Sequence, residues 1–125
     1  MAYIMNNYIY IFTRQDMIPE QQAVQTGHAT LKLGCAMGKY KNDAAPIGWN
    51  QLRYSNPNDT HFTLVGVRNL EALTAVATIL EKFGFDYETF IEPDMNNEPT
   101  SIALYPIPED KRSILMAFNL LKMGK

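Results

Sequence analysis

Four polar residues in the stretch 21–34 (QQAVQTGHATLKLG) have the types and the spacing that chemistry requires. In an α-helix each residue turns by about 100°, so one stripe about 60° wide holds Gln21, Gln25, His28 and Lys32. His28 stands at the border between this polar stripe and an apolar one. A histidine that is partly shielded from water and still reaches it suits a general base or a group that positions water.

A second interpretation of the same stripe stays open. Periodicity alone favours a hydrogen-bonded boundary histidine beside a solvated face of glutamines. Small residues form a further stripe, which we expect to let the helix approach a sheet closely: Ala23, Gly27 and Gly34. The only cysteine, Cys35, lies two turns from His28, and we expect a packed, inert thiol there instead of a nucleophile.

Acidic residues gather in a second segment, 92–100 (EPDMNNEPT). Glu92, Asp94 and Glu98 supply carboxylates of the kind that hold divalent cations. The same residue types are common in ordinary loops, which is the favoured interpretation, and we expect neither a metal nor a cofactor. We expect the second histidine, His61, to be structural.

Basic and aromatic residues alternate in the segment 39–59, which we predict to be a long loop. Such interleaving can hold a single-stranded nucleic-acid end by stacking and charge. The residues concerned are Lys39, Tyr40, Lys41, Trp49, Arg53 and Tyr54. An equally weighted alternative is that the lysines follow a helix C-terminus and the tryptophan anchors the loop to the core.

The elements that must position these residues follow from the hydrophobic pattern. Strands are predicted at 8–12, 61–67, 85–91 and 100–107, and helices at 19–37, 70–83 and 108–122. Pro19 and Asn69 mark two helix starts, and Gly38 and Gly84 mark the ends. The order β-α-β-α-β-β-α predicts a three-layer α/β/α sandwich around a four-stranded mixed sheet.

Composition sets limits on the class of protein. The 125 residues predict one domain, 1–125, of an ordinary globular kind. A net charge of −2 argues against a protein that grips many phosphates of a nucleic acid. No apolar run approaches the roughly 18 residues that cross a bilayer, no secretory signal is evident, and a lone cysteine excludes an internal disulfide. We therefore expect a protein of the reducing cytoplasm.

The segment 11–30 (IFTRQDMIPEQQAVQTGHAT) resembles the opening of the second, archaeal and eukaryotic class of peptidyl-tRNA hydrolases. That family shows a strand ending in Arg-x-Asp-Leu and then a helix with Ala-Ala-Gln-x-x-His-Ala. The matching residues are Arg14, Asp16, Gln25, His28 and Ala29. The later stretch ALYPIPEDK is similar to the family's last strand and its entry into the final helix.

The resemblance implies hydrolysis of the ester that joins a peptide to the 3′ ribose of a tRNA, by a protein that forms a homodimer. His28 would be the base or would hold the attacking water, and Asp94 would orient it. Gln25 and Thr100 would bind substrate or transition state, and Arg14 would meet a phosphate or support the turn. Lys39 and Lys41 would help to hold the tRNA 3′ end.

A non-catalytic binding module of the same fold is the rival hypothesis. The family has lysines in the turn before the helix, where this chain has Pro19, Glu20 and Gln21. The family's Asp-Ala-Gly-Arg-Thr loop is replaced here by residues 92–100, which look like a branch that carries Glu-Pro-Asp. The retained Gln25, His28 and acidic loop favour the enzyme, whereas the lost lysines and the acidic net charge favour the module.

Overall fold

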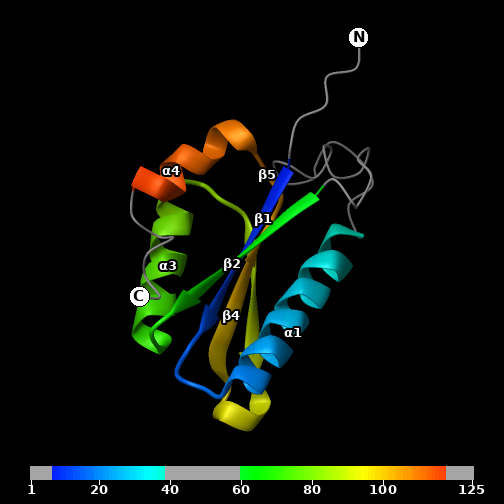
Figure 1. The fold of residues 1–125 in the computed structure, drawn as a ribbon, viewed down its shortest axis with the longest axis vertical. Coiled ribbons are helices and arrows are strands. Elements are labelled where there is room, and N and C mark those ends of the chain that lie inside the picture. Colours follow the sequence, from blue (N-terminus) through cyan, green and yellow to red (C-terminus); the bar gives the residue numbers. More distant parts are fainter. Residues whose placement is uncertain (1–6, 39–59, 118–125) are drawn as a thin grey trace.

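A computed structural model describes residues 7–38 and 60–117 of the chain (Figure 1). The main elements, in chain order, are β1 (Asn7–Arg14), α1 (Pro19–Met37), β2 (Thr60–Val67), α3 (Leu70–Lys82), β3 (Tyr87–Glu92), β4 (Glu98–Leu104), β5 (Ile107–Pro108) and α4 (Arg112–Ala117). Single 3₁₀ turns, η2 (Pro93–Met95) and η3 (Glu109–Lys111), follow β3 and precede α4. The order β-α-β-α-β-β-α is therefore confirmed.

The sheet is mixed and has the strand order β2-β1-β4-β3. β1 and β2 are parallel in a register that runs from Asn7 opposite Thr60 to Arg14 opposite Val67. β4 lies antiparallel to both β1 and β3. The expected four strands are joined by a fifth, the two-residue β5, which pairs with β1. Pro106 separates β4 from β5 because a proline has no amide hydrogen for the ladder.

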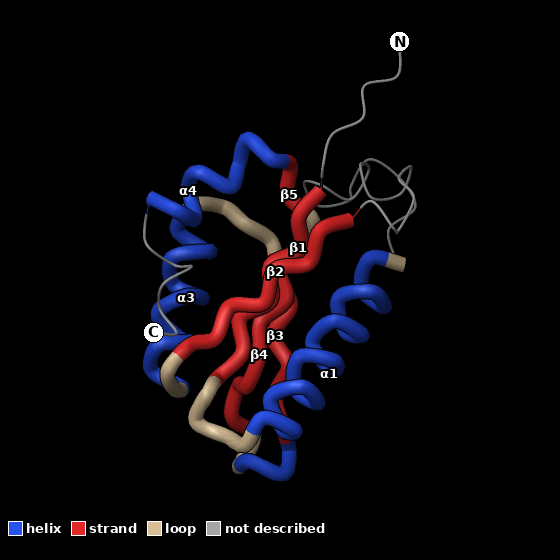
Figure 2. The backbone as a smooth tube through the Cα atoms, viewed as in Figure 1, coloured by secondary structure: helices blue, strands red, loops and turns tan. Residues whose placement is uncertain are grey.

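Helices lie on both sides of the sheet, with α1 on one side and α3 on the other (Figures 1 and 2). Side chains of β1 belong to the cores on both faces, as is expected of a strand buried on both sides. Ile9 and Ile11 pack under α1, with Ala29, Leu33 and Met37 from that helix. The opposite face of the sheet packs under α3 in a larger core, to which β1 contributes Tyr10 and Phe12. The two cores make the predicted three-layer α/β/α sandwich.

Local signals set the helix boundaries where they were expected. Pro19 is the first residue of α1, and the side chain of Asn69 caps α3 by accepting a 3.0 Å hydrogen bond from the amide of Ala72. Gly84 ends the α3 segment with φ of +76°, a conformation that costs glycine little. The predicted loop 39–59 and the end of the last predicted helix, beyond residue 117, lie outside the described residues.

The rotation of α1 about its own axis differs from the expectation. The seam that faces the sheet is Gln25, Ala29, Leu33 and Met37. Gly27 and Gly34 face away from it, and a Cβ added at either would meet no atom within 4 Å. The small residues therefore do not serve close packing on the sheet, and Cys35 is exposed instead of packed. Both expectations were wrong because spacing fixes angles between side chains but not which face turns inward.

Within the described residues, no helix combines the length and the apolar character that crossing a membrane requires.

Candidate active site

A buried glutamine links α1 to the end of the sheet where β3 ends and β4 begins. Gln25 is fully buried in the first half of α1, at a position where the rest of the seam is apolar. Its side-chain carbonyl accepts a hydrogen bond of 2.6 Å from the hydroxyl of Thr100 in β4. Its amide nitrogen donates one of 2.8 Å to Oε1 of Glu92, the last residue of β3. Burial of an amide is costly unless it is paired, and here both ends have partners.

His28 lies one helical turn beyond Gln25 and is exposed. Its imidazole stacks on the ring of Phe90 with centroids 4.4 Å apart and planes inclined by 7°. One further turn along, Lys32 donates a 2.7 Å hydrogen bond to the backbone carbonyl of Thr89. The polar stripe of α1 thus runs beside β3 in the opposite direction, and the imidazole lies between two fixed contacts.

Arg14 closes the carboxyl end of β1 on the opposite face of the sheet from α1, the face to which Tyr10 and Phe12 also point. Its guanidinium donates to both carboxylate oxygens of Asp16, at 2.9 and 2.8 Å. The remaining nitrogen donates to Oε1 of Glu98 at 2.7 Å and to the carbonyl of Pro99 at 3.2 Å. The residue is only 5% exposed, so this arginine supports the turn and has no free edge for a phosphate.

These contacts change the ionisation of the pair. Hydrogen bonding to Asp16 raises the pKa of Arg14 above its usual value, against the opposing effect of burial. The same hydrogen bonds from Arg14 hold the pKa of Asp16 below 3.8. Both groups are therefore charged at neutral pH. Arg14 in addition ties β1 to the start of β4 through Glu98 and Pro99.

A chain of buried hydroxyls lies beside Gln25, and the sequence pattern did not predict it. The hydroxyl of Thr13 lies 2.8 Å from that of Ser101 and 2.7 Å from that of Thr26. Because Thr26 donates its own proton to the carbonyl of Gln22, the chain runs from Ser101 through Thr13 to Thr26. It joins β4, β1 and α1. Threonine and serine inside otherwise apolar strands were the only sequence signal for it.

The acidic segment forms a tight turn between β3 and β4. Asp94 lies exposed within the 3₁₀ turn and has no hydrogen-bond partner among the described residues. Asn96 and Asn97 follow with φ of 56° and 59°, a left-handed conformation that asparagine tolerates. The turn closes where the amide of Asn97 donates to the carbonyl of Glu92 at 3.1 Å.

The structure thus brings some of the predicted site residues together and separates others. Gln25 is hydrogen-bonded to both Thr100 and Glu92. His28 lies one helical turn further along, on Phe90, and Asp94 lies in the turn that follows Glu92. Burial of Gln25 and Thr100, both with 0% exposure, prevents the direct contact with a substrate that was expected of them. Lys39 and Lys41 lie outside the described residues.

The described residues do not form a metal site, since no three His, Cys, Asp or Glu side chains there group closely enough to hold an ion. Glu92 and Glu98, two of the carboxylates considered for one, instead accept hydrogen bonds from Gln25 and Arg14. On the side of α3 an open hollow of about 620 Å³ borders the arginine cluster, lined by Asp16, Asn69, Leu70, Glu71, Thr74 and Glu98. Its three carboxylates make this hollow a poor receptor for phosphate.

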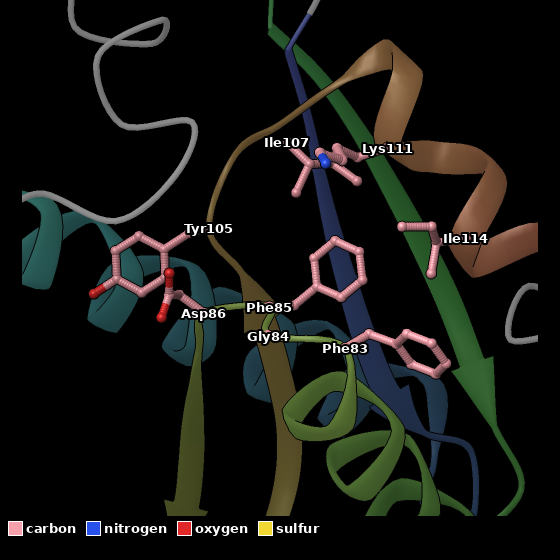
Figure 3. Close-up of a pocket in the computed structure, with 8 residues that line it drawn as sticks. All are labelled: Phe83, Gly84, Phe85, Asp86, Tyr105, Ile107, Lys111 and Ile114. Carbon is pink, nitrogen blue, oxygen red and sulfur yellow. The ribbon is translucent and has the colours of Figure 1, made fainter.

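A smaller cavity of about 60 Å³ lies at the other end of β3 and β4 (Figure 3). The rings of Phe83, Phe85 and Tyr105 line it, together with the side chains of Lys111 and Ile114. It lies near the start of β3, whereas His28 stacks on Phe90 further along that strand. A water molecule takes up about 30 Å³ in the liquid, so the cavity has room for about two waters. The polar end of the sheet is therefore the better candidate for chemistry.

The chain matches no known family model, and no curated protein matches it significantly.

Proposed function

We propose that the protein hydrolyses the ester bond of peptidyl-tRNA or of a related aminoacyl ester, with His28 as the base. One observation carries the proposal: α1 places an exposed imidazole on Phe90, one turn from the contact between Gln25 and Glu92. An ionisable ring in a fixed orientation beside a carboxylate is the arrangement that general-base attack of water needs. The choice of this ester as the substrate rests on the resemblance to the second class of peptidyl-tRNA hydrolases.

In this reaction a water molecule attacks the ester carbonyl carbon and gives a proton to a ring nitrogen of His28. The tetrahedral intermediate then collapses, and the bond from the carbonyl carbon to the ribose oxygen breaks. The imidazolium returns its proton to that oxygen, which leaves a free 3′ hydroxyl and a peptide carboxylic acid, and the acid loses its remaining proton to solvent. The resemblance gives the acidic role, which is to orient the base or the water, to Asp94 in the turn that follows Glu92.

The charge distribution restricts how a tRNA end would approach. The hollow beside α3 carries the carboxylates of Asp16, Glu71 and Glu98 and would repel phosphates. We therefore expect the substrate to approach along the polar stripe of α1, where Lys32 supplies a positive charge. Lys39 and Lys41 follow this helix in the sequence and are the proposed contacts for the 3′ end.

The deciding experiment is release of peptide from purified peptidyl-tRNA by wild type and by His28→Ala. We expect the variant to lose about 10²–10⁴-fold in rate, the typical contribution of a positioned acid or base, and to stay folded because the side chain is exposed. His61→Ala is the matched control, since His61 is also exposed and stacks on an aromatic ring, Tyr8, with centroids 4.8 Å apart. Equal rates in folded His28→Ala and wild type would refute the proposal.

The second candidate is a binding module of the same fold that performs no chemistry. Pro19, Glu20 and Gln21 stand where the family has lysines, and the net charge of the chain is −2. This hypothesis expects measurable binding of a tRNA 3′ end without release of peptide. Restoring a lysine at Gln21 (Gln21→Lys) should then create activity, whereas the enzyme hypothesis expects wild type to be active already.

We further propose that the working form is a homodimer in the reducing cytoplasm. The exposed free thiol of Cys35 suits such a compartment. The apolar side chains left exposed on β2 support a second copy of the chain, and their test is given below.

A further inference from the structure

We propose that Glu92 is the carboxylate that works with His28, and that the buried pair of Gln25 and Thr100 positions it. The proposal rests on the ester hydrolysis proposed above and gives the acidic role to a different residue from the one that the resemblance suggests. Glu92 would touch the attacking water and be catalytic, whereas Gln25 and Thr100 would act only through it.

The geometry of Glu92 suits this role. Oε1 accepts a hydrogen bond from Gln25, the main-chain carbonyl accepts one from Asn97, and the side chain is half-buried. Among the described residues Oε2 has no partner, so it is free to accept a hydrogen bond from the water whose other proton passes to His28. Glu92 is therefore held at its backbone and at one oxygen while the other oxygen stays available, as a group that positions water must be.

The contacts of His28 and Glu92 lie on adjacent turns of α1 and on the same face of β3. Phe90, which lies beneath the imidazole, and Glu92 are two residues apart, so both point toward α1 and lie about 7 Å apart along β3. On the helix, His28 and Gln25 are neighbours at i and i+3. One water molecule between the imidazole and the free carboxylate oxygen can be hydrogen-bonded to both.

Asp94 is held much less firmly. It lies exposed in a single 3₁₀ turn and has no hydrogen-bond partner in the described part of the chain. A carboxylate that solvent surrounds must be ordered anew for each reaction, which weakens its contribution to the rate. Of the two carboxylates, Glu92 is the one that the fold orients.

The direction of the buried hydrogen bonds shows what Gln25 does. A carboxylate only accepts, so the glutamine must turn its NH₂ group to Glu92 and its carbonyl to Thr100, whose hydroxyl then donates. The carboxylate thus fixes the amide orientation, and Thr100 supports it by donating to the carbonyl at the other end of the side chain. A leucine at position 25 would fill the seam as Leu33 does, so packing alone does not require the amide.

The test compares rates of peptide release by variants of the full-length protein. Glu92→Gln should lower kcat by at least about 100-fold, more than Asp94→Asn does. Glu88→Gln is the matched control on the same strand, because Glu88 also accepts one hydrogen bond, from Tyr105 at 2.7 Å. A larger loss in Asp94→Asn than in Glu92→Gln would overturn the assignment.

A second set of variants distinguishes a positioning role of Gln25 and Thr100 from a purely structural one. The double variant Gln25→Leu/Thr100→Val replaces both buried polar groups by apolar ones of similar shape, so its melting temperature should stay near that of wild type. Its kcat should nevertheless fall by about 10–100-fold, with little change in KM, while Thr100→Ser, which keeps the donor, should retain the rate. A double variant that is stable and fully active would overturn the positioning role.

A measurement without substrate keeps this inference distinct from the proposed function. The side-chain NH₂ signals of Gln25 in a ¹⁵N NMR spectrum should shift in Glu92→Gln and in Thr100→Val and should stay in place in Glu88→Gln. Unchanged signals in the first two variants would overturn the positioning role whatever the activity. Wild type that releases no peptide would overturn the proposed function, and with it the catalytic role of Glu92.

Discussion

Buried polar side chains, each fully paired, distinguish this protein at the scale of single residues. Thr13 and Arg14 in β1 and Gln25 in α1 are buried at positions where such elements usually carry apolar residues. Each is matched by partners from β4 or from the turns beside it. Loss of one partner would leave a buried group unpaired, which costs about 1–3 kcal/mol.

The ion pair of Arg14 and Asp16 gives a pH-dependent prediction. The pKa of Asp16 lies below its usual 3.8 because Arg14 donates to both of its oxygens. A carboxyl group with a lowered folded-state pKa stabilises the fold fully above its usual pKa, and this stabilisation is lost as pH falls through the lowered value. We therefore expect Asp16→Asn to lower the free energy of unfolding at neutral pH by about 0.5–1 kcal/mol, a value reduced for solvent screening.

Urea unfolding at pH values from about 2 to 7 would measure this difference. The gap between wild type and Asp16→Asn should close below pH 3.8. Asp86→Asn serves as the control, because Asp86 is exposed and lies at the other end of the sheet. A gap that stays constant down to the lowest pH would contradict the ion-pair explanation.

At the scale of elements, α1 presents a polar and apolar seam to the sheet and a nearly uncharged face to solvent. Val24 and Leu31 are exposed on that outer face, beside Gly27, Gly34 and Cys35. The glycines there neither approach another backbone nor adopt a positive φ. They weaken the helix without a packing reason in the described structure.

Gly27→Ala should therefore stabilise the protein by about 1 kcal/mol, the difference in helix propensity between the two residues. An added methyl group at this position would meet no atom within 4 Å. Gly84→Ala should do the reverse and cost about 1–2 kcal/mol, because the φ of +76° at Gly84 is strained for alanine. Denaturant unfolding of Gly27→Ala and Gly84→Ala measures both changes in the free energy of unfolding. Destabilisation by Gly27→Ala would show that the outer face of α1 is covered.

At the scale of the whole molecule, the sheet has one edge whose apolar side chains face no helix of the described chain. β2 pairs only with β1, and its Phe62 and Leu64 are 57% and 63% exposed on the face that carries α1. An edge strand without charged residues is a template for pairing with another chain. A two-fold axis at Thr63 would place Phe62 opposite Leu64 of a second copy, so the two edges are self-complementary.

We expect the double variant Phe62→Ser/Leu64→Ser to convert a dimer of the wild-type protein into a monomer. Light scattering coupled to size-exclusion chromatography would measure the mass. Val24→Ser/Leu31→Ser is the matched control, since these side chains are similarly exposed on α1. A wild-type monomer, or dissociation by the control pair alone, would show that residues outside the described ranges or another face cover these side chains.

The sequence by itself determined the elements and their order. Pro19, Asn69 and Gly84 mark boundaries through the backbone chemistry of single residues, which acts over one turn of chain and needs no tertiary contact. The apolar run at 8–12 was enough to place β1 between two layers. His28 is exposed instead of partly shielded, because the apolar stripe beside which the sequence placed it, Val24 and Leu31, is not the buried one.

Only the tertiary structure decided which face of α1 turns to the sheet and what each polar residue meets. Val24 and Leu31 are as apolar as Ala29 and Leu33, so periodicity could not choose between the two faces. The choice depends on hydrogen bonds between residues far apart in the chain, such as Gln25 with Thr100 and Glu92. The local spacing of residues cannot predict such contacts. The partners of Gln25 are 67 and 75 residues away in the sequence and become neighbours only when the strands pair.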